Sequence, residues 1–109
     1  MSNFDLLKDA IKNKEVVSFT YDGFSRVVEP FVLGDTHTMR HAIRAYQTAG
    51  GSSSGNVSGW HLFLLDKILW LSKTGEHFDG EREDYNPSDK GMLRIYRTDA
   101  PEIEQRTTI

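Results

Sequence analysis

Arginine and aromatic side chains are the residues of this sequence whose spacing points most directly to chemistry. Arg40, Arg44 and Tyr46 are separated by even numbers of residues, so they share one face of an extended strand. A guanidinium offers planar N–H donors to phosphate oxygens, and aromatic rings offer stacking surfaces to nucleobases. This pattern favours binding of a short single-stranded nucleic acid or a nucleotide. Residues of similar type lie on segments that we expect to be neighbouring strands: Tyr21, Arg26, Trp60 and Lys67.

The same residues also have a purely structural interpretation. Tyr21, Tyr46 and Trp60 would then belong to the hydrophobic core, and the arginines would solvate the surface of the sheet. The spacing alone leaves both interpretations open.

Other kinds of chemistry find little support in the sequence. The absence of cysteine excludes disulfides, zinc–thiolate sites and cysteine nucleophiles. The four histidines have no further ligands placed to complete a metal site. Ser52, Ser53 and Ser54 lie in a glycine-rich segment, which gives a nucleophile no fixed base and lacks the ending of a P-loop. We therefore expect a protein without enzymatic activity, metal or cofactor.

Length and charge limit the class of protein further. The chain has 109 residues, which suits one small domain, and a net charge of −3, which argues against a general DNA-coating protein. Acidic residues concentrate between positions 76 and 89, a stretch that lacks the spacing of a calcium-binding loop. No apolar stretch is long enough to span a membrane, and the first residues do not resemble a signal peptide. We expect a soluble cytoplasmic protein with no membrane partner.

A helix must precede the strands that carry these residues. Over residues 3–14, Phe4, Leu7 and Ile11 recur on one face, as in an amphipathic helix. Asn3 is the expected N-cap, and Asn13 is the expected end of the helix.

Short strands are predicted for most of the remaining chain. Asp22-Gly23 is a strong hairpin signal, and Pro30 indicates a bulge or an edge. A helix is the alternative for residues 40–47, whereas the apolar run 60–65 favours a central strand. The predicted strands are 15–22, 25–33, 40–47, 60–65, 68–71 and 92–97, with a flexible loop over 48–59.

This order of elements predicts an α+β, mostly β fold: a helix and a small bent antiparallel sheet that forms a half-open barrel. We expect residues 1–97 to form a single domain and residues 98–109 to be a loosely held tail. The predicted core contains Val17, Phe19, Val28, Ile43, Phe63 and Leu65.

Five short motifs occur along residues 4–72 in a characteristic order. They are Ala10-Ile11, Tyr21, Val28-Glu29-Pro30 with Leu33, Ala45-Tyr46-Gln47, and Phe63-Leu64-Leu65-Asp66-Lys67-Ile68. In their order and spacing the sequence resembles the WYL domain, a bacterial module. His41-Ala42-Ile43 stand where that family has Trp-Tyr-Leu, and Lys67 replaces its arginine.

The resemblance implies an SH3-like or Sm-like barrel preceded by a helix. It also implies a ligand-sensing domain of bacterial regulators, including regulators of transcription and phage defence, that responds to single-stranded DNA or a small nucleotide. It adds Gln47 to the candidate ligand site, as well as His61, which stands at the position of the family's ligand-contacting arginine. The helix-turn-helix domain that usually precedes the module is not part of this sequence. The alternative is an accessory module that binds a regulatory or defence protein, and homo-oligomerisation is left open.

Overall fold

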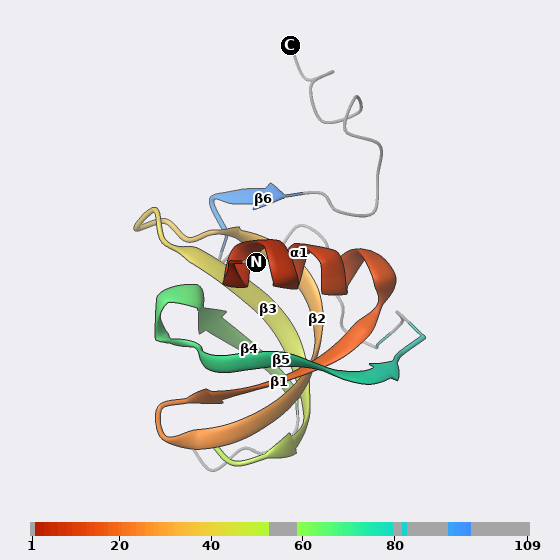
Figure 1. The fold of residues 1–109 in the computed structure, drawn as a ribbon. Coiled ribbons are helices and arrows are strands. Elements are labelled where there is room, and N and C mark those ends of the chain that lie inside the picture. The colour runs from red at the N-terminus through yellow and green to blue at the C-terminus, as the bar shows by residue number, and fades with distance from the viewer. Residues whose placement is uncertain (1, 53–58, 80–81, 83–91, 97–109) are drawn as a thin grey trace.

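The computed structural model describes residues 2–52, 59–79, 82 and 92–96. It consists of an N-terminal helix and a strongly bent antiparallel sheet that does not close into a barrel (Figure 1). The predicted α+β, mostly β fold is confirmed. The elements are α1 (Asn3–Asn13), β1 (Glu15–Tyr21), β2 (Phe24–Asp35), β3 (His41–Gly50), β4 (Gly59–Leu64), the 3-10 helix η1 (Leu65–Lys67), β5 (Leu69–His77) and β6 (Arg94–Tyr96).

Helix α1 forms where its apolar spacing predicts, but its N-cap differs from the expected one. The Ser2 hydroxyl accepts a hydrogen bond from the backbone N–H of Asp5 at 3.1 Å, which is the capping role expected of Asn3. The Asn3 side chain instead donates to the carbonyl of Ile68 at 3.5 Å. The helix ends at Asn13, as predicted, and Lys14 takes the left-handed conformation that closes it (φ 55°).

The strands lie in the order β4-β3-β2-β1-β5, and β6 pairs with β2 beyond this series. The prediction that residues 60–65 form a central strand is wrong, because β4 ends the series and, among the described strands, pairs only with β3. Its apolar run has another physical cause. Phe63 packs into the core on one face of the sheet, while Leu62 and Leu64 pack into a second apolar cluster on the other. Burial on both faces produces the same run of apolar residues as a central position.

The six predicted core residues are all buried beneath α1, and Leu7 and Ala10 contribute the helix face. A bulge in β2 at Phe31 shifts the register between Pro30 and Val32, which confirms the irregularity expected at Pro30. Past this bulge, Leu33 faces the core and Val32 joins the second cluster with Met92.

Other strand boundaries differ from the predicted ones. Strand β3 continues to Gly50 and β5 to His77, so the loop expected from residue 48 begins later. The rest of that loop, at 53–58, and the predicted tail at 98–109 lie outside the described residues. In the described part of the chain, no helix has the length and apolar character needed to cross a membrane.

Candidate ligand-binding site

Arg26 is buried on the core side of the sheet, although it carries a charge. It pairs with Phe19 across β1 and β2, so the two side chains face the same way, and only 3% of Arg26 is exposed. Its Nη1 donates to Oε1 of Gln47 at 3.2 Å, and its Nη2 donates to the carbonyl oxygen of Tyr21 at 3.1 Å. These two hydrogen bonds fix the plane of the guanidinium.

Three aromatic rings surround the guanidinium carbon. The centroids of Tyr21, Phe24 and Phe63 lie 5.5, 5.7 and 5.5 Å away, within the range of a cation–π contact. We call Tyr21, Phe24, Arg26, Gln47 and Phe63 the arginine cluster. Within the described residues no carboxylate pairs with Arg26, and its buried Nε has no hydrogen-bond partner. A buried charge without an anion is costly, so this site is electrostatically suited to one.

Gln47 connects the arginine cluster to the end of β3. It is fully buried, and its Nε2 donates to the carbonyls of Ala49 and Gly51 at 3.2 and 2.9 Å. Gly50 has φ 101° and leaves no room for a Cβ against the carbonyl oxygen of Ser25. The chain therefore closes tightly over Gln47, and the amide oxygen stays aimed at Arg26.

A partly exposed rim adjoins the cluster at the β1–β2 hairpin. The Tyr21 hydroxyl accepts a hydrogen bond from the backbone N–H of Leu64 at 3.0 Å, which holds the ring. Lys67 Nζ lies 5.3 Å from that ring and 3.1 Å from a carboxylate oxygen of Asp22, whose hydrogen bond raises the pKa of Lys67. The Phe24 ring is 39% exposed. The buried cation therefore has the Lys67–Asp22 ion pair and a partly exposed aromatic residue beside it.

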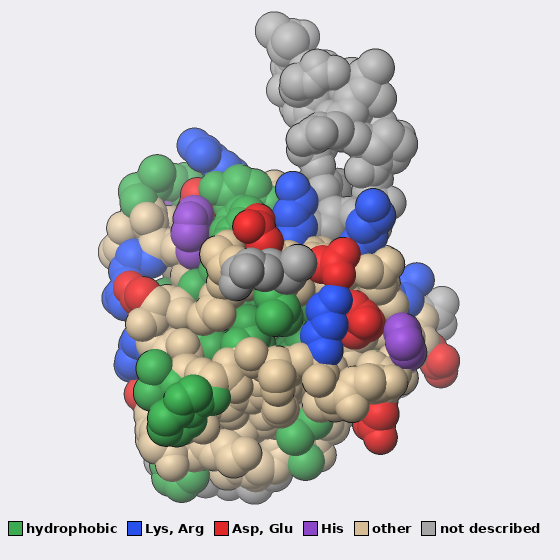
Figure 2. Space-filling view, viewed as in Figure 1, with side chains coloured by type: hydrophobic (Ala, Val, Ile, Leu, Met, Phe, Trp, Pro, Cys, Tyr) green, Lys and Arg blue, Asp and Glu red, His purple; other side chains and the backbone are tan. Residues whose placement is uncertain are grey.

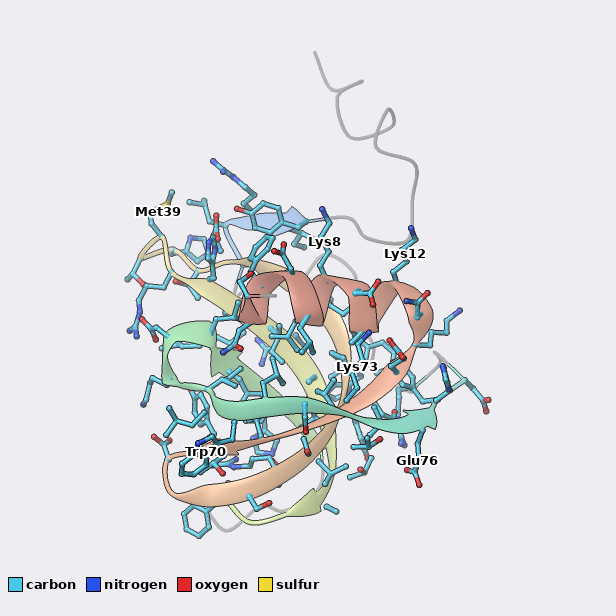
Figure 3. The ribbon with its side chains drawn as sticks, viewed as in Figure 1. Lys8, Lys12, Met39, Trp70, Lys73 and Glu76 are labelled. Carbon is cyan, nitrogen blue, oxygen red and sulfur yellow. The ribbon has the colours of Figure 1, made fainter. Side chains whose placement is uncertain are left out.

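Trp70 stands at the same end of the sheet and is 81% exposed. Ser18 pairs with Ser72 and Thr20 with Leu69, so two residues of β5, Trp70 and Leu71, lie opposite one of β1. Trp70 occupies this bulge with φ 56°. Figure 3 places it beside the β1–β2 hairpin, where Figure 2 shows hydrophobic side chains standing out from the surface. A bulge that turns an indole into solvent gives a stacking surface.

The remaining sequence-predicted residues lie elsewhere. Arg40 precedes β3, and its Nη2 donates to both carboxylate oxygens of Asp66 at 2.8 and 2.9 Å. Arg44 and Tyr46 share a strand face, as predicted, but it is the face opposite the arginine cluster. Trp60 pairs with Tyr46 across β3 and β4, with ring centroids 5.4 Å apart.

Arg82 covers the ring of Tyr46 on this opposite face. Its guanidinium carbon lies 3.9 Å from the ring centroid, and Nε and Nη2 donate to Glu29 at 2.9 and 3.0 Å. The hydrogen bond to Glu29 raises the pKa of Arg82. The aromatic surface that the sequence analysis assigned to a ligand is therefore occupied by the protein itself.

His61 lies on the core side of the sheet, opposite Ala45, and its ring centroid is 5.7 Å from that of Phe63. The structure thus brings together only part of the predicted site: Tyr21, Arg26, Gln47 and His61, with Lys67 at the rim. It also adds three aromatic residues that the sequence analysis missed: Phe24, Phe63 and Trp70. The position of Phe24 directly after the Asp22-Gly23 turn could have identified it as a partner of Tyr21, whereas no local signal marks the bulge at Trp70.

Asp35 forms a second polar cluster at the far end of β2. Its carboxylate accepts hydrogen bonds from His41 Nδ1 at 2.6 Å and from the Tyr96 hydroxyl at 2.8 Å. Burial raises the pKa of Asp35, but these hydrogen bonds outweigh it and hold the pKa below its ordinary value. The bond to Asp35 raises the pKa of Tyr96. Because Phe4 packs against both His41 and Tyr96, this cluster fastens β6 to β2 and α1.

No family model, curated protein or solved structure matches this chain. The resemblance to WYL domains therefore rests on the motifs alone. Among residues 2–52, 59–79, 82 and 92–96, no group of three or more His, Cys, Asp or Glu side chains is arranged to hold a metal ion.

Proposed function

We propose that this protein is a non-enzymatic, WYL-like domain that binds a nucleic acid or nucleotide ligand at the arginine cluster. The observation that carries the proposal is Arg26, a residue that is 3% exposed and has no carboxylate partner within the described residues. Its desolvation opposes folding unless an anion compensates it. A ligand phosphate supplies both the negative charge and oxygens that accept hydrogen bonds from a guanidinium.

The aromatic residues at the same end favour a nucleotide over other anions. Phe24 lies next to Arg26 and is partly exposed, and Trp70 exposes its side chain beside the β1–β2 hairpin in Figure 3. A base that stacks on an aromatic ring gains about 1–3 kcal/mol. The side chains of the arginine cluster are suited to bind and orient a ligand, and none of them is a nucleophile beside a general base.

The face of the sheet that carries Tyr46 is less suited to bind a ligand than the face that carries the arginine cluster. Tyr46 is covered by Arg82, which Glu29 holds in place, and Arg40 is neutralised by Asp66. A ligand there would have to displace pairs that the protein already makes. We therefore assign the ligand to the arginine cluster, in a domain that acts in bacterial transcription regulation or phage defence.

Fluorescence anisotropy with a labelled short oligothymidylate tests this proposal. We expect binding at low salt, with log affinity falling by about 0.7 per log unit of salt for each neutralised phosphate, and weak binding of duplex DNA. Arg26→Gln should weaken binding by about tenfold or more, whereas Arg40→Gln, a matched change of a half-exposed arginine, should not. No binding at low salt would refute the proposal. A loss confined to Arg44→Ala would move the ligand to the opposite face.

An accessory protein-binding module is the second candidate function. It is favoured by Leu69 and Trp70, which are 53% and 81% exposed at the start of β5, the last strand of the series. An exposed apolar residue on an edge strand is suited to pair with another chain. Trp70→Ser would then abolish capture of a regulatory or defence protein, while Arg26→Gln would leave it unchanged.

A further inference from the structure

We propose that the arginine cluster binds the terminal phosphate of a nucleotide or oligonucleotide end-on, and does not bind an internal phosphodiester. This inference rests on the proposed function and specifies its ligand. It follows from three properties of the cluster: the donors of Arg26 that remain for a ligand, the enclosure of its guanidinium, and the position of the exposed rings.

The hydrogen bonds that Arg26 makes within the protein use two of its five N–H donors. Nη1 and Nη2 are each held by an acceptor of the protein, from Gln47 and Tyr21, whereas Nε has none in the described part of the chain. A terminal phosphate carries up to two negative charges, whereas an internal phosphodiester carries one. The terminal phosphate therefore compensates the buried charge of Arg26 more fully.

The enclosure of the guanidinium discriminates further. Tyr21, Phe24 and Phe63 surround it with rings, and Gly51 packs so closely beneath Phe24 that a Cβ there would lie 2.6 Å from the ring. An internal phosphodiester continues into a sugar on both sides, so it needs two ways out of the site. A terminal phosphate needs one, and it can therefore reach a charge that is only 3% exposed.

Phe24 marks the side from which a ligand enters. Of the three rings it is the one with a large exposed fraction, 39%, compared with 8% for Tyr21 and 1% for Phe63. A rotation of the Phe24 side chain opens the guanidinium towards the hairpin, where Lys67 and Trp70 lie. A base attached to the buried phosphate would emerge at this rim, where the indole of Trp70 is free to stack on it.

Isothermal titration calorimetry with three oligothymidylates of one length separates this inference from the proposed function. The three carry a 5′-phosphate, a 3′-phosphate or no terminal phosphate. We expect one phosphorylated oligomer to bind at least about tenfold more tightly than the unphosphorylated one, as one charge-assisted hydrogen bond provides. Equal affinities for all three would overturn the inference and leave the proposed function standing. No binding of any of them would overturn both.

Variants assign the preference to Arg26. In Arg26→Gln the preference for the terminal phosphate should disappear, and in Arg40→Gln, the matched exposed control, it should persist. If Arg26→Gln does not fold, as judged by circular dichroism, Phe24→Ala gives an independent readout. Removal of this ring should speed association of the phosphorylated oligomer severalfold in stopped-flow measurements of tryptophan fluorescence. A preference that survives Arg26→Gln, or an unchanged association rate in Phe24→Ala, would contradict the inference.

Discussion

Replacing Asp35 by alanine should lower the free energy of unfolding by about 2–4 kcal/mol. The carboxylate is buried, with 6% of the side chain exposed, and it accepts hydrogen bonds from His41 and Tyr96 at 2.6 and 2.8 Å. A hydrogen bond to a charged group contributes about 1.5–3 kcal/mol. The side chain of His41 is 51% exposed, so in the variant water replaces its lost hydrogen bond and the loss of stability from this bond is smaller. The hydroxyl of Tyr96 is partly buried, so the loss of its hydrogen bond contributes more.

Urea unfolding followed by circular dichroism at neutral pH measures this loss. For a domain of this size, about 1 kcal/mol corresponds to a change of roughly 4–8 °C in Tm, so Tm should fall by roughly 8–32 °C. A loss below about 0.5 kcal/mol, typical of a surface substitution, would refute the reasoning. It would mean that backbone pairing with β2 and apolar contacts are sufficient to hold β6.

The carboxylate of Asp35 should also make the free energy of unfolding depend on pH in the acidic range. Burial raises the pKa of Asp35, but hydrogen bonds from His41 and Tyr96 hold it below its value in the unfolded chain, about 3.9. Its contribution is therefore fully present above that value and is lost as the pH falls through the folded pKa. Asp35→Asn, which cannot titrate, should lose less stability than the native protein between about pH 5 and pH 2. Identical acid profiles for the two proteins would contradict this account.

Three further predictions concern contacts in different parts of the fold. Gly34→Ala should destabilise the fold by about 1–3 kcal/mol, because its Cβ would meet the backbone oxygen of Arg94 on β6; unchanged urea unfolding would contradict this contact. Trp70→Gly should stabilise the free protein by about 1 kcal/mol, because glycine adopts the left-handed backbone conformation of this position without strain. The same change should weaken oligonucleotide binding. A lower stability of the variant would contradict this prediction and show that the indole packs against the protein. A double-mutant cycle of Glu29→Gln and Arg82→Gln should give a coupling of about 1 kcal/mol, because the pair is bidentate and partly buried; additive losses would contradict it.

Local signals were sufficient to predict most of the fold. The period of Phe4, Leu7 and Ile11 identified α1, and Asp22-Gly23 fixed the register of the β1–β2 hairpin. Strict alternation along β3 placed Ile43 on the core side and Arg44 on the other. These features depend on neighbours in the sequence, so a single sequence carries them.

Strand order and the covering of the outer face depend on contacts that the sequence does not encode locally. Position 82 supplies the arginine that covers Tyr46, and Met92 covers the second apolar cluster. Nothing near Tyr46 in the sequence indicates that its ring is already occupied. The alternation of side chains along β3 was predicted correctly. The residues that cover this face come from distant parts of the sequence and could not be predicted from it.

Arg26 shows how a candidate residue can be found while its environment is missed. It alternates with Val28, a core residue, which places it on the core side. A sequence interpretation nevertheless expects arginine at the surface, because buried charges are rare. Only the contacts with Gln47, Tyr21 and the surrounding rings reveal a buried cation.

The Nε–Hε resonance of Arg26 gives the most direct test of ligand binding at the arginine cluster. It can be assigned in a ¹⁵N–¹H spectrum by its loss in Arg26→Gln and followed while a terminally phosphorylated oligothymidylate is added. We predict that this resonance shifts on binding and saturates with the dissociation constant obtained by calorimetry, because the buried Nε has no hydrogen-bond partner in the described part of the chain. An Arg26 resonance that stays in place while the ligand binds elsewhere would contradict the account.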